Sequence, residues 1–145
     1  MNDLLDLYPV VIEQPVAWGD MDSHGHVNNV WIFRYIENAR IAYYENIGKY
    51  DFERDTGKGF ILAATTCKFI SPLIYPDIVR VGASIRDITE DRAVMHYRLV
   101  SINHKRIAAE AQATLVSFDH KTNQKIAFAD ELRLRISDLE GKLYK

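Results

Sequence analysis

Residues 28–48 read NNVWIFRYIENARIAYYENIG, and this stretch decides the fold class. Its apolar side chains recur at helical spacing and form one broad face: Ile32, Tyr35, Ile36, Ala39, Tyr43 and Ile47. Such a pattern predicts an amphipathic helix. Asn28 suits the N-cap because its amide oxygen can accept from the first turn, and Gly48 suits a left-handed residue after the helix. We expect one long helix of about five turns.

Most of the remaining chain has the residue patterns typical of β-strands. Residues 9–18 alternate loosely between apolar and polar and predict a first strand. After a charged connection at residues 51–59, four segments alternate or carry β-branched residues between short polar breaks: 60–71, 77–89, 92–103 and 106–119. Residues 125–128 can extend the sheet, and residues 130–139 predict a short terminal helix.

This order of elements predicts an α+β fold, with an antiparallel sheet of five to six strands wrapped around one long central helix. Several strands of this length need an apolar partner, and only one long helix is present to supply it. The 145 residues are the size of one domain, so residues 1–145 are expected to form a single unit. Its open sheet edges favour a homodimer or homotetramer.

Composition narrows the function. The formal net charge of −2 argues against a nucleic-acid partner or a polybasic membrane surface. Cys67 is the sole cysteine, which rules out a disulfide within the chain. It lies in the middle of a predicted strand, without an evident basic neighbour arranged to lower its pKa, so we expect a buried small residue and not a nucleophile. No segment approaches the length of a membrane span, and the N-terminus lacks the features of a signal peptide. A cytoplasmic protein with no membrane partner is expected.

The polar run from Asp20 to Asn29, just ahead of the helix, is the candidate for chemistry. Asp22 is close enough in sequence for its carboxylate to face the helix N-terminus, where free N–H groups gather. The backbone N–H of Asn29 could then stabilise an oxyanion while Asp22 attacks a carbonyl or activates water. The plainer alternative is that Asp20 or Asp22 only caps the loop.

His24 and His26 allow two further interpretations. Either imidazole could act as acid, base or orienting group, although histidines of a polar loop are often simple turn residues. Together with Asp20 and Asp22 they also resemble a metal-ligand set, but alternate residues of an extended segment point to opposite faces. We therefore predict no metal and no cofactor.

The helix carries a rival carboxylate, Glu37, which we expect to form a surface ion pair with Arg40 three residues on. The helix aromatics could line a pocket for an acyl group, although their spacing is also that of a core stripe: Trp31, Phe33, Tyr35, Tyr43 and Tyr44. Lys105 and Arg106 could meet phosphate groups, but we favour a solvated hairpin turn as the explanation of these two residues.

WGDMDSHGHVNN followed by YIENARIAYY resembles the hotdog-fold acyl-CoA thioesterases of the 4-hydroxybenzoyl-CoA thioesterase type. That family has the pattern Asp, any residue, Asp, two residues, Gly, a hydrophobic residue or His, then Val. The resemblance covers nearly the whole chain and implies a hotdog fold, a sheet around a long helix, in dimers that often pair into tetramers. The matching residues are Asp20, Asp22, Gly25, His26 and Val27.

The resemblance implies that Asp22 is the catalytic carboxylate, that the backbone of Asn29 is the oxyanion donor, and that His26 assists. HVNN at residues 26–29 also resembles plant thioesterases that act on acyl carrier protein, but those have an Asn where this chain has His24. The expected activity is hydrolysis of an acyl-CoA to a free acid and CoA. The alternatives are an acyl-carrier-protein thioesterase, a non-catalytic acyl-binding domain and a metal-dependent hydrolase.

Overall fold

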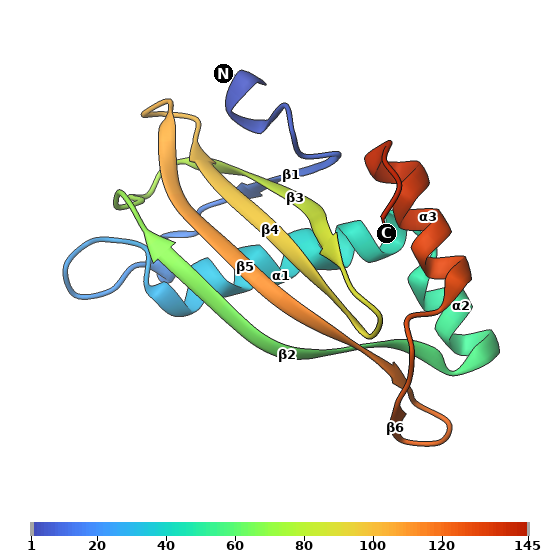
Figure 1. The fold of residues 1–145 in the computed structure, drawn as a ribbon. Coiled ribbons are helices and arrows are strands. Elements are labelled where there is room, and N and C mark those ends of the chain that lie inside the picture. The colour runs from blue at the N-terminus through green and yellow to red at the C-terminus, as the bar shows by residue number, and fades with distance from the viewer. Residues whose placement is uncertain (1, 145) are drawn as a thin grey trace.

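The computed structural model describes residues 2–144 and has one antiparallel sheet curled around one long helix, α1 (Asn29–Asn46). The sheet contains β1 (Val10–Pro15), β2 (Lys58–Phe69), β3 (Ile78–Ile88), β4 (Arg92–Ser101), β5 (Arg106–Asp119) and the short β6 (Gln124–Lys125). Its strand order is β1-β3-β4-β5-β2, with β6 paired to β5. Figure 1 shows α1 lying across the concave face of this sheet. The expected hotdog fold is confirmed.

The predicted helix forms because its apolar face is buried against the sheet. All six residues of the predicted stripe are buried, and Asn28 caps the helix by accepting a hydrogen bond from the backbone N–H of Val30. Gly48 has a φ of +64°, the left-handed conformation expected after the helix. The inner face of the sheet supplies the facing core, with Val81, Ile85, Met95, Leu99 and Leu115 almost fully buried.

One expected connection is wrong. Residues 51–59 were expected as a loop, whereas α2 (Lys49–Thr56) begins directly after Gly48 and ends at Gly57. This helix was not evident from the sequence, because its eight residues are mostly polar and only Ile47 and Gly48 separate it from α1. The helix is held instead by an ion pair between Lys49 and Glu53, with the Lys49 ammonium also 4.8 Å from the ring centres of Tyr44 and Tyr50.

The predicted terminal helix is present as α3 (Asp130–Glu140), and it closes an open part of the sheet. β1 pairs with β3 only as far as Ala83, so the backbone of β3 beyond it lacks a strand partner there. Glu140 accepts a hydrogen bond from the N–H of Ile85, and Tyr144 donates to the Ile85 carbonyl. Across residues 2–144 no helix is long and apolar enough to cross a membrane.

Candidate functional site

The loop ahead of α1 folds into a tight hairpin that places Asp22 opposite His26. The N–H of Asp22 donates to the His26 carbonyl at 2.8 Å, and the N–H of Gly25 donates to the Asp22 carbonyl at 3.0 Å. Met21 and Val27, the residues just outside this pair, form an isolated antiparallel β-bridge. Gly25 has a φ of +75°, which a residue with a Cβ rarely adopts, so the glycine in this motif makes the turn possible.

The turn uses only one of the two carboxylate oxygens of Asp22 as a hydrogen-bond acceptor. Its Oδ1 accepts from the backbone N–H of His24 at 2.9 Å and from that of His26 at 3.4 Å. No donor within residues 2–144 is hydrogen-bonded to Oδ2. One oxygen therefore fixes the side chain, and the other remains open to a ligand or to water.

Asn29 is the first residue of α1, and its N–H is a free donor of the helix end. Asn28 receives the N–H groups of Val30, Trp31 and Ile32 through its side-chain and backbone oxygens. Neither this cap nor any other described group accepts from the N–H of Asn29. An unpaired donor at the positive end of a helix dipole is a suitable group for a developing negative charge.

Asp22, His26 and Asn29 line one cleft of about 360 Å³. The opposite wall comes from the end of β2 and the segment after it, and from the start of β5: Phe69, Ile70, Ser71, Pro72, Leu73 and Ala108. Figure 1 shows the loop before α1 at the same end of the molecule as the arrowhead of β2. Sequence reasoning missed this wall, because residues 69–71 and Ala108 fall in predicted strands and residues 72 and 73 in a predicted break, with no signal of which part of the sheet would face the loop.

Asp20, two residues before Asp22, has a structural role. It is 7% exposed, and its Oδ2 accepts from the Ala17 N–H at 3.0 Å and from the Tyr35 hydroxyl at 2.5 Å. Burial, reinforced by the hydrogen bond to Asp20, raises the pKa of Tyr35, so the phenol stays protonated and donates. This contact fastens the loop to the middle of α1.

The alternative of a metal centre finds no support in the side-chain arrangement. His24 is exposed and does not line the cleft. Within the described part of the chain no three His, Cys, Asp or Glu side chains come together as a ligand set. The buried position of Asp20 separates it from the neighbouring Asp and His residues of the loop.

The expected ion pair between Glu37 and Arg40 is wrong. Glu37 pairs with Arg34 instead, at 2.6 Å on the helix surface. Arg40 is 7% exposed and its Nη1 donates to the hydroxyl of Tyr97 at 3.1 Å, under the helix. All three charged side chains line a second groove, of about 470 Å³, between α1 and β2. Trp31 and Phe33 line it too, whereas Tyr35, Tyr43 and Tyr44 belong to the core.

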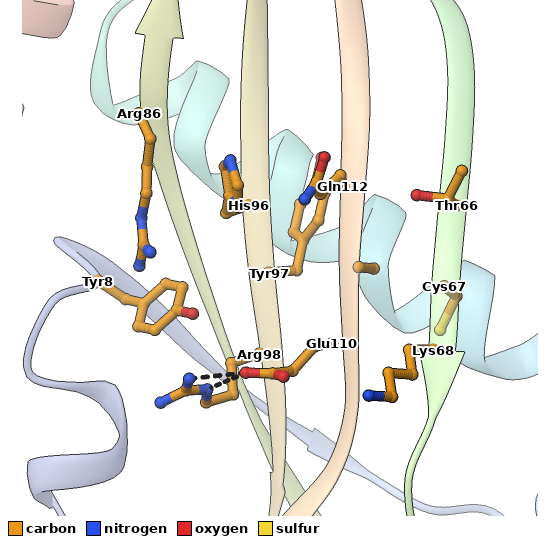
Figure 2. A pocket seen from close by; sticks show the side chains of 11 residues that line it. Tyr8, Thr66, Cys67, Lys68, Arg86, His96, Tyr97, Arg98, Glu110 and Gln112 are labelled. Atoms are coloured by element: carbon orange, nitrogen blue, oxygen red, sulfur yellow. Dashed lines mark hydrogen bonds and ion pairs between the residues drawn. The ribbon is translucent and has the colours of Figure 1, made fainter.

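A third hollow, of about 400 Å³, lies on the opposite face of the sheet. Figure 2 shows it with α1 behind the strands. Both of its arginines are held by neighbours: Arg98 pairs with Glu110 at 2.6 Å, and Arg86 lies over the ring of Tyr8. Burial, with a contribution from Arg86, lowers the pKa of His96 in this hollow. None of the candidate site residues lies here.

Two minor expectations can be placed. Cys67 lies in β2, and burial raises its pKa to about 11, so the thiol is protonated at neutral pH and behaves as a small side chain. Lys105 and Arg106 are exposed at the turn between β4 and β5, and Lys105 takes a φ of +53°. Cys67 therefore fits a packing role in the strand, and Lys105 and Arg106 fit a solvated hairpin turn.

Comparison with known proteins gives consistent matches. A curated relative, the long-chain acyl-CoA thioesterase FadM of Escherichia coli, is 20% identical over 119 residues, which are 82% of this chain and 90% of that protein. Among solved structures, a Thermus thermophilus thioesterase complexed with coenzyme A and Zn is 26% identical with a TM-score of 0.83, covering 94% of this chain and 98% of that one.

The PA2801 protein of Pseudomonas aeruginosa is 30% identical with a TM-score of 0.77, covering 89% of this chain and 98% of that one. The family model described as the Thioesterase-like superfamily matches residues 16–136, a span that contains the hairpin, α1, the strands β2 to β6 and most of α3. The expected thioester hydrolase is confirmed at this level: the chain belongs to the Thioesterase-like superfamily.

Proposed function

We propose that this enzyme hydrolyses acyl-CoA thioesters in the cleft lined by Asp22, His26 and Asn29. The observation that carries the proposal is the pairing of an open carboxylate oxygen with a free helix-end N–H in one cleft. Hydrolysis of a thioester needs both a nucleophile or base and a donor for the oxyanion. The Thermus relative complexed with coenzyme A supports CoA as the carrier.

In this mechanism the thioester carbonyl points at the N–H of Asn29, which stabilises the negative charge of the tetrahedral intermediate. Oδ2 of Asp22 either attacks the carbonyl carbon or removes a proton from the attacking water. The carbon–sulfur bond breaks, the sulfur leaves as the CoA thiolate and takes a proton, and water supplies the hydroxyl of the acid. The His26 imidazole, across the hairpin from Asp22, orients the water or the carbonyl.

The surface also supports the proposed assembly of identical subunits. β2 is an edge strand of 12 residues in the sheet order, and Leu62, Phe69 and Ile70 are exposed on it or directly after it. Val30 and Trp31 are exposed on the adjacent start of α1. A second copy pairing along this edge would cover the unpaired backbone of β2 and would close the groove between α1 and β2 from outside, so that its apolar lining faces an enclosed space. The cytoplasmic location stays a prediction.

The proposal is tested by replacing the open carboxylate. Asp22→Asn keeps the size of the side chain and an acceptor for the turn, but removes the charge. We expect the rate of CoA thiol release from acyl-CoA to fall about 100- to 10,000-fold, the range for loss of a positioned acid or base. The measurement is a free-thiol assay over short, long and aromatic acyl-CoAs, with binding of each followed by calorimetry.

Asp119→Asn is the matched control. The Oδ1 of Asp119 also accepts two backbone N–H groups, from Lys121 and Thr122, but this residue lies at the other end of β5. It should leave the rate unchanged. Equal rates in Asp22→Asn and the parent would remove Asp22 from the chemistry, and binding without turnover in the parent would favour the non-catalytic alternative. If acyl groups were hydrolysed faster from acyl carrier protein than from CoA, acyl carrier protein would replace CoA as the proposed carrier of the substrate.

A further inference from the structure

The groove between α1 and β2 is a built space for a long apolar group. Its lining is mainly apolar: Val30, Trp31, Phe33, Ile36 and Leu62. Below α1, β5 presents Ala109, Ala111 and Ala113 where the neighbouring β4 presents Tyr97, Met95 and Leu99. The small side chains of β5 let α1 pack closely on the sheet, and the groove itself is formed by α1 with Leu62 and Thr65 of β2.

This groove and the candidate cleft are neighbours at the start of α1. Phe33 lines the groove and Phe69 lines the cleft, and their rings meet edge to face with centroids 6.3 Å apart. An acyl group whose carbonyl lies at Asn29 would pass this aromatic pair to continue along α1. Both walls are continuous elements, α1 and β2, so the direction of the chain is set by the fold.

Arg40 lies at the far end of the groove and has no negative partner. It is 7% exposed, and Nη1 donates to Tyr97, yet no carboxylate of residues 2–144 pairs with its guanidinium. A buried charge is costly unless it is paired, and a guanidinium has five N–H donors to satisfy. The carboxylate in the same groove, Glu37, is already paired with Arg34.

We propose that Arg40 binds a carboxylate at the far end of the acyl group, so that the preferred substrates are CoA thioesters of medium or long dicarboxylic acids. The inference rests on the proposed thioester hydrolysis and names its substrate class. Arg40 follows Asn29 along α1 by roughly 16 Å of helix rise, and its side chain leans back toward the start of the helix. A guanidinium holds a carboxylate through two parallel N–H donors.

The test compares two acyl groups that differ only at the far end, in dodecanedioyl-CoA and lauroyl-CoA. The parent enzyme should favour dodecanedioyl-CoA in kcat/KM. Arg40→Met should reduce this preference about ten- to a hundredfold, the effect of losing a hydrogen-bonded charge partner. Arg40→Lys, which keeps the charge but loses the planar fork, should restore part of it.

Arg98→Met is the control, because it removes a half-buried arginine from the opposite face of the sheet. It should leave the preference unchanged. An equal loss for both substrates in Arg40→Met would show that Arg40 only supports the fold through Tyr97. Dissociation of the assembly in that variant, seen by light scattering, would make Arg40 an interface residue. A parent enzyme without preference would overturn the proposal even if the variants fail to fold.

Binding separates this inference from the proposed function. Non-hydrolysable thioether analogues of the two substrates can be titrated calorimetrically against Asp22→Asn and against Asp22→Asn combined with Arg40→Met. Tighter binding of the carboxylate-ended analogue that depends on Arg40 supports the inference, whether or not the parent enzyme hydrolyses the thioester. Equal binding of the two analogues contradicts it, even if hydrolysis is confirmed.

Discussion

The loop ahead of α1 contains two aspartates, Asp20 at its base and Asp22 in the hairpin, and they differ in burial and in hydrogen bonding. Asp20 at the base is buried, and one of its oxygens accepts from both Ala17 and Tyr35. Asp22 at the tip uses one oxygen to hold the turn and leaves the other open in a cleft. The first arrangement stabilises the loop, and the second leaves a carboxylate available for chemistry.

The same contrast separates the hollows of the protein. The hollow of Figure 2 is polar and comparable in volume to the cleft, but its carboxylate, Glu110, is already paired with Arg98. The cleft at Asp22 holds a donor and an acceptor that have no partner in the described chain. Open hydrogen-bonding groups therefore identify the candidate site better than size does.

The largest expected difference in stability is between Asp20→Ala and Asp22→Ala. Removing Asp20 leaves the buried Tyr35 hydroxyl without its acceptor and also frees the N–H of the exposed Ala17, at a cost of about 2–4 kcal/mol in the free energy of unfolding. Removing Asp22 should cost about 1 kcal/mol or less, because its turn is solvated. Urea unfolding of both variants measures this, and equal losses would break the comparison.

A smaller effect is expected at Gly25, which allows the hairpin between Asp22 and His26. Gly25→Ala meets no atom within 4 Å but must hold a φ of +75°. The left-handed conformation should cost about 1–2 kcal/mol. Gly19→Ala is the control, because its added Cβ also has open space and its backbone needs no positive φ. If thermal unfolding showed the two variants to be equally stable, the hairpin would not depend on this glycine.

The smallest expected effect is the alkaline response of the loop base. Since burial and Asp20 raise the pKa of Tyr35 above its ordinary value of 10.0, the protonated phenol stabilises the folded state. This contribution is complete below pH 10 and is lost as the pH rises toward the folded pKa. Tyr35→Phe should cost about 1 kcal/mol at pH 7 and flatten the fall in stability above pH 10. Urea unfolding as a function of pH measures it, and an unchanged slope would exclude Tyr35.

Much of the fold was predictable from local patterns. The stripe from Ile32 to Ile47 is at helical spacing, and residues 109–115 alternate through the middle of β5. Both signals are long and are repeated many times, so tertiary context does not override them. α2 was missed because an eight-residue polar helix has almost no apolar period. Its stability comes from contacts such as Lys49 with Glu53.

The candidate site was predictable only in part. The motif placed Asp22, His26 and Asn29 near the start of the helix, and the structure brings these three residues to one cleft. Their catalytic roles remain predictions. The opposite wall at residues 69–73 and the position of Arg40 could not be read from the sequence. Arg40 shows this most clearly. Its spacing from Glu37 predicted a surface ion pair, whereas in the structure Arg40 is buried and hydrogen-bonded to Tyr97.

The long helix, the strands that follow it and the polar turn with its glycine can all be inferred from local sequence, because each depends on side chains close together along the chain. Local sequence does not reveal which aspartate is buried, which N–H remains free, or where Arg40 points. Those outcomes depend on groups far apart in sequence, such as Asp20 with Tyr35 and Arg40 with Tyr97, which meet only when the sheet closes around α1.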